Sequence, residues 1–64
     1  MKLEQILKER YMSRNQLAVN AGITPSDLYS AISGKKAFFP GWRKRIADYL
    51  QMEEEEVFPE YREE

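Results

Sequence analysis

SRNQLAVNAGITPSDLYSAISGK, residues 13–35, decides the fold of this 64-residue chain. Ser13 is a preferred N-cap, and Gln16 stands three residues later, so the two residues form a capping box. An apolar stripe at helical spacing follows: Leu17, Ala18 and Ala21. Gly22 ends this element, because glycine adopts the left-handed backbone conformation without steric cost. The pattern predicts a helix over 14–21.

A second helix begins three residues after this glycine. Its first turn holds an N-cap, a proline at the first helical position and an acid where the helix dipole favours an anion: Thr24, Pro25 and Asp27. Leu28 and Ile32 stack at i and i+4 on the buried side, and Gly34 ends the helix. Ile23 fills the turn between the two helices. The pattern predicts a helix over 25–33.

Two short helices joined by a glycine-containing turn form a helix-turn-helix motif. The small Ala18, Gly22 four residues later and Leu28 six residues after that give the motif its detailed spacing. The stretch resembles the DNA-binding domains of the Cro and phage-repressor family of bacterial transcription regulators. The resemblance extends more loosely to Ile46, Ala47, Leu50, Val57, Phe58 and Pro59. It implies a compact, all-α, lambda-repressor-like domain of four to five helices.

Length and composition set the limits of the function. Sixty-four residues make one domain, 1–64. The chain has no cysteine and no histidine, which argues against disulfides, a zinc site and most catalytic constellations. We therefore expect no enzyme activity, no metal and no cofactor, and no small-molecule ligand is evident. No apolar run approaches the roughly 20 residues of a membrane span, and no signal peptide is visible. The expected location is the cytoplasm, away from any membrane.

The remaining segments also read as helices and short connections. Leu3, Ile6, Leu7 and Tyr11 form an apolar stripe that predicts a first helix over 2–11. The segment 34–40 reads as a loop with two partly buried phenylalanines, Phe38 and Phe39. A fourth helix is expected over 41–51.

The fourth helix has an apolar face formed by Trp42, Ile46, Tyr49 and Leu50. We expect Trp42 to be a core residue rather than a stacking platform for bases. The resemblance implies a short fifth helix that docks Val57 and Phe58 on the core, with acids in its first turn. The last four residues, 61–64, are expected to fray.

Charge divides the chain into a basic body and an acidic tail. Residues 1–50 carry nine Lys or Arg against four Asp or Glu, a net charge of +5. Residues 51–64 carry one Arg and seven Glu, a net charge of −6, and most of this acidic tail lies at about 53–64. The total of −1 therefore conceals a basic region that suits a nucleic-acid partner.

The helix over 25–33 separates its residues into two faces on a helical wheel. Leu28, Ala31 and Ile32 cluster on one side, and Ser26, Ser30 and Ser33 point away from them. The resemblance implies that this is the recognition helix, with four base-reading residues: Pro25, Ser26, Tyr29 and Ser30. The alternative is an ordinary solvated helix face. Asp27 is read as a helix-start residue rather than a base contact.

The candidate phosphate contacts flank this helix. The resemblance puts the start of the first motif helix against a phosphate, and four cations follow or face the recognition helix. The candidates are Ser13, Arg14, Lys35, Lys36, Arg43 and Lys44. Simple surface solvation is the competing explanation. Arg45 adjoins the apolar stripe. Its side chain is expected either to lie along that stripe with the charged end in water or to extend into solvent.

Two functions fit these features. The first is a sequence-specific DNA-binding transcription regulator that acts as a homodimer on double-stranded DNA with a two-fold operator. We expect a repressor that occludes a promoter, and contact with the polymerase is the alternative mechanism. The second is a protein-interaction module that retains the fold, such as an antitoxin or an accessory subunit. For the dimer surface we expect the C-terminal apolar residues Tyr49, Met52, Val57, Phe58 and Tyr61.

Overall fold

A computed structural model describes residues 1–61 of the chain. Within that range the regular structure is entirely helical, and no strand is present. The elements are α1 (Lys2–Glu9), α2 (Arg14–Ala21), α3 (Pro25–Ile32), α4 (Pro40–Leu50), α5 (Glu54–Val57) and the 3-10 helix η1 (Pro59–Tyr61). The described chain is therefore a small all-α domain, as the sequence predicts.

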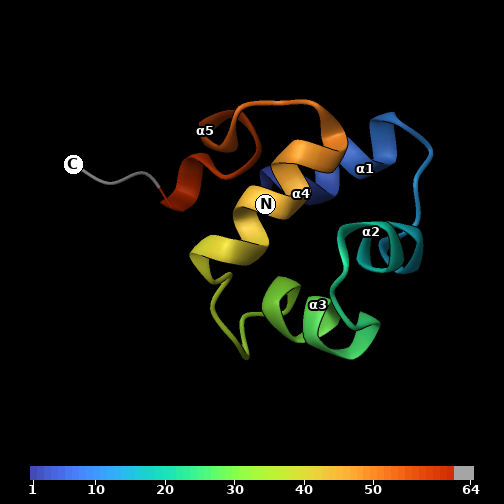
Figure 1. Ribbon diagram of the computed structural model, residues 1–64, viewed down its shortest axis with the longest axis vertical. Helices are drawn as coiled ribbons and strands as arrows, with labels where there is room; N and C mark the ends of the chain where they lie inside the picture. Colours follow the sequence, from blue (N-terminus) through green and yellow to red (C-terminus); the bar gives the residue numbers. More distant parts are fainter. Residues whose placement is uncertain (62–64) are drawn as a thin grey trace.

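The helices surround one core, with α4 at its centre (Figure 1). The second helix packs on both α3 and α4, while α5 packs on α4 and α1. In the view of Figure 1, α3 lies at the lower edge and α5 at the upper left, so these two helices occupy opposite ends of the molecule. The principal extents are 31 × 24 × 18 Å. No helix within residues 1–61 has the length and apolar character needed to cross a membrane.

Every helix contributes apolar side chains to the core, and the loop residues Ile23 and Phe38 complete it. The largest completely enclosed side chains are Leu3, Leu17, Leu28, Phe38, Ile46, Leu50, Val57 and Phe58. No polar or charged residue is buried among those that the structure describes. Apolar burial rather than an internal polar network therefore holds the helices together.

The first four helices all end in the same C-capping motif, the Schellman motif. In each, a backbone amide just past the end of the helix donates to a carbonyl five residues earlier. The donor and acceptor pairs are Met12 to Leu7, Ile23 to Ala18, Lys35 to Ser30 and Met52 to Ala47. The residue before each donor has a positive φ: Tyr11, Gly22, Gly34 and Gln51. Three of the four donors are apolar and turn back onto the core.

The end of α1 differs from the sequence prediction. A helix over 2–11 with Tyr11 in its buried stripe is wrong, because α1 ends at Glu9 and the side chain of Tyr11 is 96% exposed. Tyr11 instead occupies the left-handed position of the Schellman motif, with φ +54°. Met12 packs on the core in its place. The apolar spacing alone does not distinguish a final helical turn from such a cap.

The C-terminal segment packs on the core as far as Tyr61. The prediction that fraying begins at Tyr61 is therefore wrong for that residue. The rings of Phe38 and Phe58 lie 5.0 Å apart, and the Tyr61 ring packs edge-on against both. The Tyr61 hydroxyl also accepts a hydrogen bond from the Phe38 amide at 3.4 Å. The expected fraying of residues 62–64 lies outside the described residues. The short α5 with acids in its first turn is confirmed.

The structure shows which of the large apolar residues in the loop before α4, in α4 and near the C-terminus are buried and which are exposed. Val57 and Phe58 are buried, so they close the monomer core and are not available as a dimer surface. Phe38 is buried, whereas Phe39 is 51% exposed and packs edge-on against Trp42 with centroids 4.7 Å apart. Trp42 itself is half-buried against the core.

Candidate nucleic-acid interface

Both motif helices begin where the sequence predicts, and α2 ends at the predicted Ala21, whereas α3 ends at Ile32, one residue before the predicted end. The Ser13 hydroxyl accepts from the Gln16 amide at 3.0 Å, which caps α2. The Thr24 hydroxyl accepts from the Asp27 amide at 3.3 Å, which caps α3. Gly22 has φ +74°, a left-handed conformation that links the two helices at no side-chain cost. Local residue chemistry therefore accounts for this part of the fold.

Tertiary contacts fix the angle between α2 and α3. Ala18 and Leu28 are both fully buried in the space between the two helices and the rest of the core. On the outside of the turn, Nη1 of Arg45 donates to the carbonyl oxygen of Gly22 at 3.1 Å. This bond ties α4 to the turn of the motif. Arg45 is thus a structural residue of the motif, a role that its sequence position did not predict.

The outward face of α3 is polar and built from short side chains. Ser26 is exposed and Tyr29 is 47% exposed, while Pro25 and Ser30 are half-buried at its edges. Leu28 and Ala31 point into the core. The four predicted base-reading residues therefore lie on or beside one accessible helix face.

The candidate phosphate contacts come from the start of α2, from the loop after α3 and from α4. Ser13 and Arg14 are exposed at the start of α2. Lys35 and Lys36 are exposed just past the end of α3, where both of their amides donate to the carbonyl of Ser30. Lys44 is exposed on α4. These residues present hydroxyl, guanidinium and ammonium groups, the usual donors to phosphate oxygens.

Two of these cations are already paired with carboxylates from other elements. Nη2 of Arg14 lies 3.2 Å from Oε2 of Glu4 on α1. Nζ of Lys36 lies 2.7 Å from Oδ1 of Asp27 on α3. The Lys36 hydrogen bond, together with one from Thr24, holds the pKa of the Asp27 carboxyl below its ordinary value. Asp27 thus acts at the helix start, as expected, and also neutralises a neighbouring lysine.

Arg43 differs from the other candidate phosphate contacts. Its side chain is only 12% exposed, and Nη1 donates to the Phe38 carbonyl at 2.7 Å. Nε lies 3.1 Å from Glu54, and the guanidinium carbon lies 4.9 Å from the centre of the Tyr61 ring. These contacts fasten the start of α4 to α5 and η1. The Arg43 guanidinium is thus engaged within the domain and is not among the proposed phosphate contacts.

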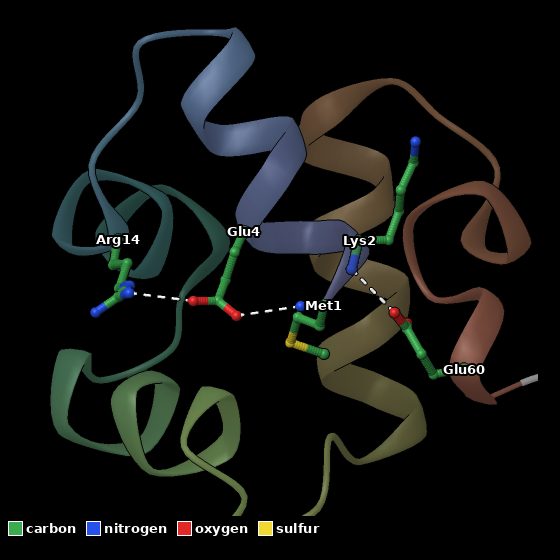
Figure 2. Close-up of polar contacts among 5 residues, drawn as sticks. All are labelled: Met1, Lys2, Glu4, Arg14 and Glu60. Atoms are coloured by element: carbon green, nitrogen blue, oxygen red, sulfur yellow. Dashed lines mark hydrogen bonds and ion pairs between the residues drawn. The ribbon is translucent and has the colours of Figure 1, made fainter.

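Sequence reasoning missed the structural role of Arg45 and the pairing of Glu4 with Arg14. Glu4 reads as half of a helical i,i+4 pair with Lys8, and nothing in the local pattern points to a partner ten residues away. The pairing becomes visible only when α1 and the start of α2 are placed side by side (Figure 2).

Comparison with known proteins adds no relative. No protein-family model, no curated protein and no solved structure matches the chain.

Proposed function

We propose that this chain is a sequence-specific DNA-binding transcription regulator that inserts α3 into the major groove. The observation that carries the proposal is the exposed polar face of α3, with Lys35 and Lys36 exposed directly after that helix and with Ser13 and Arg14 exposed at the start of α2, which packs on α3. An eight-residue helix is about 12 Å long, and the major groove is about 12 Å wide. Short side chains such as Ser26 and Ser30 let the helix approach the base edges closely.

In this proposal the four residues of the α3 face divide into donors and apolar contacts. Ser26 and Ser30 exchange hydrogen bonds with base edges, because a hydroxyl both donates and accepts. Tyr29 and Pro25 offer apolar surface to a thymine methyl group. None of the four makes the bidentate contact that arginine makes with guanine or glutamine makes with adenine. Specificity then depends on several modest contacts rather than on one dominant contact.

The phosphate contacts supply most of the affinity. The exposed start of α2 presents the Ser13 hydroxyl, the Arg14 guanidinium and the positive end of the helix dipole. Lys35 and Lys44 are exposed and make no ion pair with another described residue. Binding through these groups releases counterions, so the affinity falls steeply with salt.

A second copy is needed for a two-fold operator. Half-sites are about 34 Å apart on one face of DNA, whereas the described chain is 31 Å long and carries one α3. We infer a homodimer on DNA that acts as a repressor by covering a promoter. The acidic α5 lies at the opposite end of the molecule from α3, which keeps its carboxylates away from the phosphates (Figure 1).

A protein-interaction module, such as an antitoxin or an accessory subunit, is the second candidate function. The pair formed by the exposed Phe39 and the half-buried Trp42 favours it, because aromatic residues at the surface are typical of protein contact surfaces. The pairing of Arg14 and Lys36 with carboxylates also weakens the positive field around α3.

Fluorescence anisotropy with duplex DNA separates the two functions. We expect the chain to bind the DNA upstream of its own gene at low salt and more weakly at higher salt. Selection from a random duplex library should then return a site with two-fold symmetry. A chain that binds no duplex at low salt would contradict the DNA-binding proposal and favour the interaction module.

A further inference from the structure

Glu4 lies where α1 meets the start of α2. Its Oε2 accepts a hydrogen bond from Nη2 of Arg14 at 3.2 Å, and its Oε1 lies 3.3 Å from the amine of Met1 (Figure 2). The Glu4 side chain is 39% exposed and the Arg14 side chain 52% exposed, so the pair stands at the surface. Solvent and other anions therefore have access to both partners.

The pair borders a groove of about 360 Å³ between α1 and α2. The groove is lined by Glu4, Leu7, Lys8, Met12, Ser13 and Arg14. Its apolar lining is formed by Leu7 and Met12, and its polar lining includes Ser13 and Arg14, two of the residues that contact phosphates in the proposed function. Glu4 is the acid in this lining. Its carboxylate therefore occupies a place beside Arg14 that suits a phosphate oxygen.

We propose that Glu4 competes with a DNA phosphate for Arg14, so that Glu4 is a determinant of the affinity for DNA that lowers it for every sequence alike. The inference rests on the proposed function. When a duplex docks, the Arg14 guanidinium turns from the carboxylate to the phosphate, and Glu4 returns to water. The DNA contact of Arg14 thus replaces an existing ion pair instead of adding a new one.

An alternative role for Glu4 is to position Arg14 for the phosphate. A guanidinium has five N–H donors, and only one nitrogen of Arg14 contacts Glu4. The two roles differ in the effect of charge. Glutamine keeps the length and the accepting oxygen of glutamate but removes the negative charge. Glu4→Gln therefore preserves positioning while it abolishes charge competition.

The test is the affinity of Glu4→Gln for a selected operator duplex and for a random duplex, measured by fluorescence anisotropy at fixed low salt. We expect both duplexes to bind about two- to five-fold more tightly, the factor that corresponds to one exposed ion pair. Glu9→Gln is the matched control. Glu9 lies on the same helix, and the substitution removes the same charge from a residue that pairs with no described cation. Its effect should be smaller.

A double-mutant cycle with Arg14→Gln ties the effect to the pair. In the Arg14→Gln background, the gain from Glu4→Gln should disappear. The inference is overturned if Glu4→Gln weakens binding, which would assign the positioning role, or if its gain equals that of Glu9→Gln or persists without Arg14. Circular dichroism of each variant should keep the helical signal of the parent. Failure of the parent chain itself to bind either duplex is a different result, since it contradicts the proposed function directly.

Discussion

Arg45 on α4 donates from Nη1 to the carbonyl oxygen of Gly22 at 3.1 Å, and this bond fastens the turn of the helix-turn-helix to the centre of the domain. The turn carbonyl would otherwise depend on water, because Gly22 is exposed. The same turn needs the left-handed conformation that Gly22 supplies. The turn of the motif therefore depends on the left-handed conformation of Gly22 and on the hydrogen bond from Arg45.

Gly22→Ala should destabilise the domain by about 1–2 kcal/mol, the usual cost of placing an L side chain in the left-handed region. The added Cβ would lie 3.6 Å from Nη1 of Arg45, an ordinary contact, so the cost comes from the backbone and not from a clash. Gly41→Ala is the control, because Gly41 lies in α4 with no heavy atom near the added Cβ. It should be neutral or stabilising by roughly 0.4–1 kcal/mol. Urea unfolding measures both, and equal effects would refute this explanation.

Leu28→Ala should lower the free energy of unfolding by about 2–5 kcal/mol. Leu28 is fully buried between the motif helices and the core, so its removal leaves a cavity. The total free energy of unfolding of a small domain is only about 5–15 kcal/mol. The variant should therefore melt at a much lower temperature. Val19→Ala is a suitable comparison, because Val19 is 64% exposed on α2. A Leu28→Ala protein as stable as Val19→Ala would contradict the described core.

The Asp27–Lys36 pair should give the domain an acid-sensitive contribution to stability. Lys36 and then Thr24 lower the pKa of the Asp27 carboxyl below 3.8 in the folded state. A group with a depressed folded pKa stabilises the fold above its unfolded pKa and loses that contribution as pH falls through the folded pKa. The advantage of the parent over Asp27→Asn in melting temperature should therefore be present at pH 7 and shrink below about pH 4.

A direct measurement of this pair is the NMR titration of the Asp27 carboxyl. Lys36→Gln should raise its pKa toward the ordinary value, because the hydrogen bond from Nζ at 2.7 Å is lost. Lys35→Gln removes the same charge one residue earlier, where no such bond exists, and should change the pKa little. Equal shifts in the two variants would mean that a general field, and not the contact, lowers the pKa.

Lys35→Ala should weaken the binding of every duplex alike and lower the salt slope by about 1, as the loss of one phosphate contact requires. Lys35 follows α3 directly and is exposed. Lys2→Ala is the matched control, since Lys2 lies on α1 beside Glu60 of η1 (Figure 2). Anisotropy titrations at several salt concentrations give both slopes. If the two variants reduce the slope equally, net charge rather than contact explains the effect.

Tyr29→Ala or Ser30→Ala should change the preference among operators by about 1–3 kcal/mol at one base pair. Both residues lie on the accessible face of α3, so we expect them to contact base edges. Affinity for random DNA should change much less, because phosphate contacts dominate it. Competition between single-base operator variants measures the preference. Equal losses on operator and random duplexes would show that this face does not read bases.

Most helix boundaries could be predicted from the sequence because they depend on near neighbours. Ser13, Thr24 and Pro25 mark helix starts, while Gly22 and Gly34 mark helix ends through their positive φ. The end of α1 could not be predicted in the same way. Tyr11 takes the left-handed position that glycine usually fills, and it does so because Met12 gains burial against the core. That gain comes from distant helices and leaves no local signal.

The candidate site likewise has features that follow from the local sequence and features that depend on distant residues. The polar face of α3 follows from helical periodicity, and its exposure agrees with the wheel. The state of the surrounding cations does not follow from the sequence. Arg43 is turned inward by Phe38, Glu54 and Tyr61, although its position beside Lys44 made the two residues look alike.

The sequence by itself determined the helical class, the turn at Gly22 and the residues that α3 presents to its surroundings, because capping, backbone freedom and periodicity act over a few residues. Only the tertiary structure decided which charges remain free. Glu4 meets Arg14, and Lys36 meets Asp27, across separations of ten and nine residues that pass through a turn or a loop. Ion pairs of this kind depend on how helices lie against one another, and apolar burial in the shared core sets that arrangement.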